Sequence, residues 1–456
     1  MIPIEGRPIL IAAGMKAAEQ ASGIDLFALM TRAGEGVGRA AARLAAGAEM
    51  LVLCGPGNNG GDGYVAAAAL RRAGHEVRIA ASAPPASDLA RRAAAGWDGP
   101  VEALADVAPA PVLIDALFGT GLSRPLEPAI ADPLAGLATA ARLTLAVDLP
   151  SGVGTDDGGV LGAAGAQVTL ALGALKPAHL LEPAASLCGQ VRLLDLGTGA
   201  PDDWRVVARP QLAPPTPNSQ KYTRGLVVLV GGAMPGATLL AAEAAMRAGA
   251  GYGLLLADDL AAAGPHALVR RRWSAAALDD RRIGAVVIGP GLGREDAARA
   301  KLDAALASPH PLVIDGDALQ LLDLDRLAAR DGVAVLTPHG GEFAHLFGAP
   351  AGSKIDAALA AARRARAVVA FKGADTVIAA PDGQGRVYPR GSAWLSTAGT
   401  GDVLAGVAGA LLAAKLSPLD AAAGAVWLHA EAARRCGASF IADDLARALT
   451  PARASL

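Results

Sequence analysis

Residues 50–64 read MLVLCGPGNNGGDGY, and this stretch decides the fold of the first half of the chain. The apolar run at 50–54 predicts a buried β-strand, and the alanine-rich stretch from Tyr64 to Ala73 predicts a helix that ends at Gly74. Five of the nine residues from 55 to 63 are glycine, which is more than a plain turn requires. We therefore expect a ligand to approach the backbone between this strand and this helix, whose N-terminus favours an anion.

The same alternation of apolar runs with helical stretches continues along the chain, and it predicts parallel sheets covered by helices. The expected strands lie at 50–54, 76–80, 111–118, 142–150 and 166–172 in the first half, and at 226–232, 252–257, 285–291, 311–315, 333–338 and 367–373 in the second. Between the halves, the proline-rich segment 197–225 lacks periodicity and predicts a linker. We place one α/β domain at 1–205, the linker at 206–220 and a second α/β domain at 221–456.

Composition narrows the class of protein. The chain has 456 residues, a net charge of −2 and 18% charged residues, so it carries no basic field for nucleic acid. No apolar run reaches about 18 residues, which argues against a membrane span, and the N-terminus lacks the pattern of a signal peptide. The three cysteines are far apart, as expected of reduced thiols. We expect a soluble cytoplasmic protein that forms a homo-oligomer.

In open parallel sheets, ligands bind beyond the carboxyl ends of the strands, so the residues that follow each apolar run are the candidates. The first such stretch lacks the lysine of a P-loop and is not expected to transfer a nucleotide phosphate. Its Asn58, Asn59 and Asp62 add oxygens that can bind a sugar or a hard cation. The alternative is a tight strand-to-helix turn with asparagine in a left-handed conformation.

Two further strands of the first half end in a carboxylate. Asp115 closes one apolar run, Asp148 closes the next, and Ser151 follows three residues later. A carboxylate at the end of a buried strand is costly unless it binds something. Asn59, Asp115 and Ser151 together offer oxygen ligands for a monovalent cation, although a lone aspartate in such a place is often a helix cap.

NNGGDG, DALFGTGL and VDLPSGV, in this order, resemble the YjeF-type NAD(P)HX epimerase family over roughly residues 8–200. The resemblance implies a Rossmann-like α/β/α sandwich that inverts C6 of the hydrated nicotinamide ring, with Asp148 exchanging protons, Lys176 assisting and K⁺ bound by Asn59, Asp115 and Ser151. The dinucleotide contacts that it implies are Asn58, Asn59, Gly60, Gly61, Asp62, Gly119, Thr120, Gly121, Leu122, Ser123, Arg124, Pro125 and Asp148.

The second half contains Gly-Thr-Gly-Asp at 399–402, where a helix with an apolar face begins. The backbone N–H groups of Gly399 to Gly401 would form an anion hole, and Asp402 would be a base beside it, as in ribokinase-like kinases. KGADT (372–376) follows a strand and could cradle an adenylate phosphate. A simply capped helix start is the alternative for the first motif, and an ordinary turn is the alternative for the second.

GGAMPGA, GPGLG, TPHGGEF, KGADT and AGTGDVLAG resemble the ribokinase-like ADP-dependent NAD(P)HX dehydratase family over roughly residues 215–450. The resemblance implies ADP as co-substrate and Mg²⁺ with unidentified ligands. Its implied contacts are Ala237, Gly291, His339 and the base Asp402 for the hydrated dinucleotide, and Lys372, Gly373, Ala374, Asp375, Thr376 and Gly401 for the adenine nucleotide. Gln220, Gly316 and Gln320 stand where the family usually has histidine, alanine and asparagine.

Together the two halves predict a repair enzyme that epimerises the R and S hydrates of NADH and NADPH. Its second domain would then dehydrate the S form with ADP, giving NAD(P)H, AMP and phosphate. One alternative is a ribokinase-like small-molecule kinase with an N-terminal nucleotide-binding module. Another is a first domain that only senses or scaffolds, but a scaffold has no need of Asp148.

Overall fold

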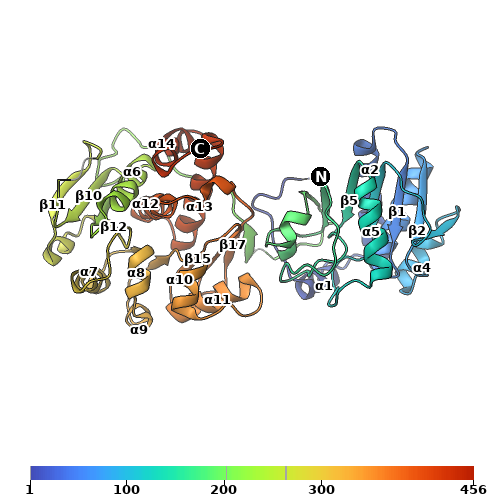
Figure 1. Cartoon of the computed structure of the whole chain (residues 1–456), viewed down its shortest axis with the longest axis horizontal. Coiled ribbons are helices and arrows are strands. Elements are labelled where there is room, and N and C mark those ends of the chain that lie inside the picture. The colour runs from blue at the N-terminus through green and yellow to red at the C-terminus, as the bar shows by residue number, and fades with distance from the viewer. Residues whose placement is uncertain (1, 202, 262–263) are drawn as a thin grey trace. The chain divides into compact units, whose positions relative to one another are not determined.

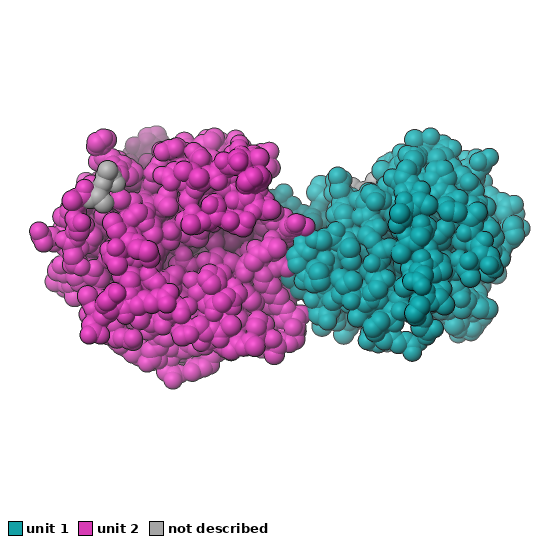
Figure 2. Space-filling view, in the orientation of Figure 1, with its two compact units in different colours: residues 1–206 teal, residues 207–456 magenta. Residues whose placement is uncertain are grey.

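The computed structural model describes residues 2–201, 203–261 and 264–456, and these form two compact units, Met1–Val206 and Val207–Leu456 (Figure 2). Each unit is an α/β domain built around a mostly parallel sheet (Figure 1). Along the described chain, no helix combines the length and the apolar character that crossing a membrane requires.

Within the described residues of unit 1, seven strands form one parallel sheet in the order β3-β2-β1-β4-β5-β6-β7. The strands are β1 Met50–Cys54, β2 Val77–Ala81, β3 Val101–Ala103, β4 Val112–Ala116, β5 Leu143–Val147, β6 Val168–Leu172 and β7 Gln190–Leu194, and the short β8 Trp204–Val206 ends the unit. The helices are α1 Ala12–Ala21, α2 Leu26–Ala45, α3 Asn58–Arg72, α4 Asp88–Ala94 and α5 Pro128–Ala140.

Alternate residues of β1 serve the two faces of this sheet. Met50, Val52 and Cys54 pack in one apolar cluster with α2 and α3, and Leu51 and Leu53 pack in another with α5. A strand that is buried on both faces reads as a continuous apolar run, which is why the run 50–54 predicted it correctly. The result is the predicted α/β/α sandwich.

Helix α3 begins earlier than the sequence indicated. We expected a helix from Tyr64, but α3 starts at Asn58, so NNGGDG forms its first turns instead of a loop. The glycines permit close packing here: a Cβ on Gly60 would collide with the backbone of Gly55, and one on Gly63 would lie 2.7 Å from the Cβ of Ala116. Glycine therefore acts by bringing the helix against the strand ends, more than by bending the chain.

Unit 2 carries the larger sheet, whose strands follow the order β11-β10-β9-β12-β13-β14-β15-β16-β17. The strands are β9 Leu226–Val230, β10 Tyr252–Ala257, β11 Val269–Arg272, β12 Ile283–Ile288, β13 Leu312–Ile314, β14 Ala334–Leu336, β15 Val368–Phe371, β16 Thr376–Ala379 and β17 Gly385–Tyr388. The helices are α6 Pro235–Arg247, α7 Asp296–Ala307, α8 Gly316–Leu321, α9 Leu324–Ala328, α10 Gly340–Phe347, α11 Lys354–Ala365, α12 Thr400–Ala413, α13 Pro418–Cys436 and α14 Ala442–Ala454.

Strands β9 to β15 are all parallel, and β16 and β17 complete the sheet as antiparallel strands. Helices α6, α12, α13 and α14 pack on one side, where their alanines, leucines and valines form the main apolar cluster of the unit (Figure 1). This layered architecture places the carboxyl ends of β12 to β15 and the N-terminus of α12 along one edge of unit 2.

Candidate active sites

In unit 1 the strand order reverses between β1 and β4, which makes a crevice at their carboxyl ends. A cavity of about 530 Å³ lies there. Its lining includes Asn58, Asn59 and Asp62 from α3, residues 119–124 from the loop after β4, and Asp148 after β5. The structure therefore brings together nearly all the residues that we expected in the first site. Pro125 is outside the lining, and Gly60 and Gly61 support it from within α3.

Asp148 is held more tightly than the sequence suggested. Its φ is +64°, a left-handed conformation that costs a non-glycine residue free energy and is found mainly at functional sites. Its Oδ1 accepts hydrogen bonds from the Nζ of Lys176 at 2.5 Å and from the backbone N–H of Leu172 at 3.0 Å. Lys176 is 1% exposed, so the pair is buried and the ammonium balances the carboxylate.

His179, which the sequence analysis missed, fixes the backbone of Asp148. The N–H of Lys176 donates to His179 Nδ1 at 2.9 Å, so the ring proton is on Nε2, which donates to the carbonyl of Asp148 at 2.6 Å. Burial, followed by the charge of Lys176, lowers the pKa of His179 to about 4. The imidazole is therefore neutral near pH 7 and acts as a structural support.

The three expected K⁺ ligands also lie together. Asp115 is buried, and its oxygens accept only from neutral donors: Ser151 Oγ at 2.6 Å, Ser151 N at 2.8 Å and Leu117 N at 3.2 Å. Burial raises the pKa of this carboxyl because these hydrogen bonds offset only part of the desolvation. The Nδ2 of Asn59 is buried without a partner, and its Oδ1 lies 3.0 Å from the position of a Cβ on Gly119. A carboxylate without a nearby positive charge, beside hydroxyl and amide oxygens, fits a cation.

Unit 2 has its own reversal of strand order, between β9 and β12. Ala237 in α6 and Gly291 after β12 meet there, since a Cβ on Gly291 would lie 3.0 Å from that of Ala237. Gly291 has a φ of +63°, and Thr238 Oγ1 donates to the carbonyl of Pro290 at 2.8 Å. These two expected dinucleotide contacts are thus adjacent, in the crevice where an open sheet binds ligands.

Asp402 lies in the first turn of α12, beside Gly399 and Gly401. A Cβ on Gly401 would lie 3.4 Å from Lys372 Nζ and 3.7 Å from Asp315 Oδ2, so both charged groups approach the anion hole. Burial raises the pKa of Asp402 to about 6, and the Asp315 carboxylate adds to the shift, while Lys372 opposes it. A base with a pKa near the working pH is well suited to proton transfer.

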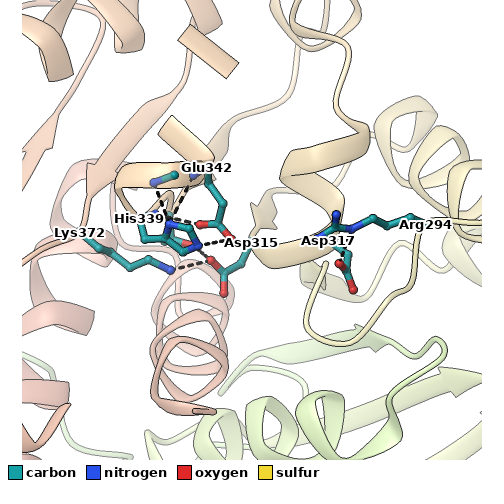
Figure 3. Close-up of polar contacts among 8 residues, drawn as sticks. Arg294, Asp315, Asp317, His339, Glu342 and Lys372 are labelled. Atoms are coloured by element: carbon teal, nitrogen blue, oxygen red, sulfur yellow. Dashed lines mark hydrogen bonds and ion pairs between the residues drawn. The ribbon is translucent and has the colours of Figure 1, made fainter. Parts of the chain in front are cut away.

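Asp315, at the end of β13, was absent from our predicted site. It is 3% exposed, and its Oδ1 accepts from Thr337 Oγ1 at 2.7 Å and from Lys372 Nζ at 2.9 Å (Figure 3). Asp317 lies apart from this pair and holds the loop after β12, through Gly293 N at 3.0 Å and Arg294 Nε at 2.9 Å. The signal was in the sequence: Asp315 directly follows an apolar run, as Asp115 and Asp148 do.

His339 caps helix α10. Its Nδ1 accepts from Gly341 N at 3.0 Å and Glu342 N at 3.3 Å, and Glu342 Oε2 accepts from the N–H of His339 at 2.8 Å (Figure 3). The His339 side chain is 62% exposed, and its Nε2 lies 3.4 Å from Glu342 Oε1. Burial raises the pKa of the Glu342 carboxyl, and Lys372 opposes the shift. His339 thus combines a capping role with an exposed imidazole ring.

A second cavity, of about 470 Å³, lies between the β15–β16 turn and α12 and α13. His339, Lys372, Gly373, Ala374, Thr376 and Gly401 line it together with apolar side chains. Asp375 does not, because its buried carboxyl pairs with Lys354 of α11. His429 of α13 lines this cavity too, with Nε2 2.9 Å from the carbonyl of Thr400, and no local sequence pattern indicates this role.

The three departures from the family pattern lie at different places in the structure: Gly316 directly follows Asp315, Gln320 lies further along α8, and Gln220 lies before β9. Gly316 begins α8 with a φ of +51°, where an alanine would be strained. Gln320 is in the same helix, and its carbonyl lies 3.3 Å from His345 Nε2. Gln220 precedes β9, and its carbonyl accepts from Thr223 Oγ1. In the parts of the chain that the structure describes, no three His, Cys, Asp or Glu side chains gather as metal ligands.

Comparison with known proteins gives matches over both units. A family model described as YjeF-related protein N-terminus matches residues 26–178, and one described as NAD(P)H-hydrate dehydratase matches residues 227–452. A bifunctional NAD(P)H-hydrate repair enzyme of Mycobacterium tuberculosis H37Rv is 36% identical, with 83% of this chain and 81% of the relative covered. The enzyme of that name from Escherichia coli K12 is 34% identical, with coverage of 94% and 89%.

Among solved structures, a ribokinase-like superfamily protein from Enterococcus faecalis V583 superposes with a TM-score of 0.50. It is 24% identical, and the match covers 56% of this chain and 96% of the other. This likeness concerns the fold, and it agrees with the ribokinase-like architecture expected for the second half.

Proposed function

Because this chain belongs to the family of bifunctional NAD(P)H-hydrate repair enzymes, we propose that it restores hydrated NADH and NADPH with two active sites in one polypeptide. Unit 1 interconverts the R and S hydrates. Unit 2 removes water from the S hydrate with ADP and releases AMP and phosphate. The family relationship favours this function over the small-molecule kinase that we considered as an alternative.

The observation that carries the dehydratase assignment is the placement of Asp402 beside the anion hole, with Lys372 Nζ next to Gly401. Asp402 would deprotonate the C6 hydroxyl of the S hydrate, and Gly399 to Gly401 would hold the transferring phosphoryl group through their N–H groups. Phosphorylation turns a poor leaving group into a good one. The lone pair of the ring nitrogen then expels phosphate to give an iminium ion, and loss of a proton from C5 restores the C5=C6 double bond.

We propose that the adenine nucleotide occupies the cavity of about 470 Å³, with Lys372 and Gly373 at its phosphates. The hydrated dinucleotide would bind toward Ala237 and Gly291, with His339 beside the ring. Mg²⁺ would accompany the nucleotide, whose phosphates supply most of its ligands in sites of this kind. The buried Lys354–Asp375 pair gives Asp375 a supporting role in the turn instead of direct nucleotide contact.

In unit 1, Asp148 would exchange protons at C6, and Asn58 to Asp62 with residues 119–125 would hold the dinucleotide. Asn59, Asp115 and Ser151 fit K⁺, which would neutralise the buried Asp115 carboxylate and stabilise the loops on which the dinucleotide lies. The supporting observation is that Asn59 and Asp148 line the cavity at the reversal of strand order, while Ser151 is hydrogen-bonded to Asp115 at the end of β4.

The free thiols of Cys54, Cys188 and Cys436 fit a reducing compartment, and we propose a cytoplasmic location. We also propose a homo-oligomer, which light scattering on the purified protein tests. The proposed domain ranges remain 1–205 and 221–456, joined by the linker 206–220.

The function is tested with the purified protein and the separate R and S hydrates of NADH. Each hydrate is incubated with and without ADP, and the return of absorbance at the reduced-nicotinamide band is followed. We expect ADP-dependent recovery from both hydrates. A failure to recover the S hydrate with ADP would exclude the dehydratase. Recovery of the R hydrate only at the spontaneous rate of epimerisation would exclude the epimerase.

A further inference from the structure

Two carboxyl groups that line the unit 1 cavity, Asp62 and Glu19, have no side-chain hydrogen bond or ion pair within the described residues, and of the two only Asp62 is buried. It lies in the first turns of α3, is 9% exposed and lines the same cavity as Asp148. Within the described residues, its side chain has no hydrogen bond and no ion pair, whereas Asp115 and Asp148 are each held by at least two donors. This difference between three buried aspartates requires a physical explanation.

A buried carboxylate without a partner is costly, so the neutral acid is the favoured form of Asp62. Burial raises its pKa well above the ordinary value, and the nearby charges of Asp148 and Glu19 raise it further. Lys176 lowers it, but the Lys176 ammonium is already bonded to Asp148 and to the carbonyl of Leu172. The positive end of α3 favours an anion, but that effect fades within the first helical turn, and Asp62 is the fifth residue of α3.

The two buried carboxyl groups of the cavity therefore differ in their surroundings: Asp148 forms an ion pair with Lys176, whereas Asp62 has no partner among the described residues and burial favours its neutral form. We propose that Asp62 is a second catalytic residue of the epimerase, the acid that protonates the hydroxyl leaving C6 while Asp148 accepts a proton from the water that enters on the other face. The proposal rests on the epimerase function proposed for unit 1.

The C6–O bond breaks, its electron pair takes the proton of Asp62, and water leaves. The lone pair of the ring nitrogen N1 forms a C6=N1 double bond, which gives an iminium ion. Water then adds to the opposite face of C6, the double-bond electrons return to N1, and Asp148 takes the proton of the added water. The configuration at C6 is inverted, and one proton has moved from Asp62 to Asp148.

The product state is the starting state for the reverse reaction, because each carboxyl now has the protonation that the other had. An enzyme that interconverts two hydrates requires this symmetry. In the free enzyme, re-forming the ion pair between Lys176 and Asp148 drives the proton back to Asp62 through water in the cavity. The buried lysine thus resets the pair after each turnover.

The test uses the full chain with Asp62→Asn, which keeps the size of the side chain and removes the acid. Recovery of NADH from the R hydrate with saturating ADP reports the epimerase, and recovery from the S hydrate reports unit 2 in the same molecule. We expect the kcat of R-hydrate repair to fall at least about 100-fold, with little change in KM and unchanged S-hydrate repair. Asp62→Glu should restore part of the rate, and the exposed Asp106→Asn should match the wild type.

Two measurements on the wild type test the proposal independently of any variant. The rate of R-hydrate repair should fall as pH rises, because Asp62 loses its proton. The rate of S-hydrate repair should not show this alkaline fall, because it does not depend on Asp62. In water labelled with ¹⁸O, each epimerisation should place one labelled oxygen at C6, because the C6–O bond breaks.

Several results would overturn the proposal: R-hydrate repair by Asp62→Asn within threefold of the wild type, a change confined to KM, or epimerisation without ¹⁸O uptake. If Asp62→Asn does not fold, a wild-type profile without the alkaline limb would also overturn it. A wild type that fails to accelerate epimerisation at all refutes the proposed function of unit 1, and this outcome is distinguishable from the others.

Discussion

Both units place a lysine–aspartate ion pair at the carboxyl edge of the sheet, yet the pairs serve the proposed bases differently. In unit 1, Lys176 pairs with Asp148, which is the proposed proton-exchanging residue itself. In unit 2, Lys372 pairs with Asp315, and Asp402 at the start of α12 has no ion-pair partner among the described residues. The Lys176–Asp148 pair includes the proposed base of unit 1 itself. The Lys372–Asp315 pair instead places its two charges beside Asp402, the proposed base of unit 2.

The difference matches the chemistry proposed for each unit. Inversion at C6 requires no added anion, so an ammonium can remain bonded to the base. Phosphoryl transfer brings an anionic nucleotide to the site, so Lys372 must face that ligand, and Asp315 holds it there beforehand. Burial raises the pKa of Asp402, and the neighbouring Asp315 carboxylate raises it further. The comparison predicts distinct consequences when each pair or base is altered.

The largest effect is expected for Asp402→Asn. Loss of the base should lower the kcat of S-hydrate repair by about 10²- to 10⁴-fold, because the hydroxyl must be deprotonated as it attacks phosphorus. The measurement is recovery of reduced-nicotinamide absorbance from the S hydrate with ADP. Conversion of R to S hydrate, followed by chromatography without ADP, should be unchanged. Comparable loss of both activities would contradict the independence of the two sites.

Asp148→Asn should abolish R-hydrate repair beyond the spontaneous rate while S-hydrate repair persists. It also leaves the Lys176 ammonium buried without its partner, and breaking a buried pair costs about 3–5 kcal/mol. Calorimetry should therefore show a lower unfolding temperature for unit 1 alone. Asp148→Asn with enzymatic R-hydrate repair intact would show that Asp148 is not the proton-exchanging group.

Replacement of K⁺ by choline should slow R-hydrate repair about tenfold, equivalent to about 1.4 kcal/mol in the barrier. The reason is that Asp115 has only neutral donors around it, so its charge would remain uncompensated. Initial rates at constant ionic strength measure the effect. Ser151→Ala should show a weaker response to K⁺ than the wild type; equal responses would argue against a cation at Ser151.

The smallest effect is expected for Asp315→Asn, as a change in pH dependence. S-hydrate repair by the wild type should fall as pH drops below about 6, because the base Asp402 becomes protonated. Removing the Asp315 charge takes away one cause of the raised pKa, so the acidic limb should move toward lower pH. The control Asp317→Asn should move the limb less, since Asp317 contributes less to the shift. An unchanged limb in Asp315→Asn would refute this coupling.

Much of the fold was predictable from the sequence because strands buried on both faces are continuous apolar runs. Strand β1 and its central neighbours were found in this way, whereas β11, with the sequence VRRR, was not, because it pairs on one side only and carries exposed charges. The start of α3 was wrong because glycine disfavours helices intrinsically, and tertiary packing overrode that preference.

The sites were predictable where a polar residue directly follows an apolar strand, as Asp148 does, or forms part of a glycine motif, as Asp402 does. The sequence could not reveal His429, which reaches the cavity from the middle of α13 by helix packing alone. Nor could it show that Asp375 is bonded to Lys354, twenty-one residues earlier. Such contacts depend on how elements pack, and local patterns do not encode them.

The Lys354–Asp375 contact has a consequence for binding kinetics. Lys354 Nζ bonds both the carboxylate and the carbonyl of Asp375, and so anchors the turn between β15 and β16 that carries Lys372 and Gly373. The loss of conformational entropy that accompanies ordering of that turn therefore occurs during folding, before any nucleotide binds. Association should then require no slow rearrangement of this segment, and its amide protons should exchange slowly with solvent in the ligand-free protein.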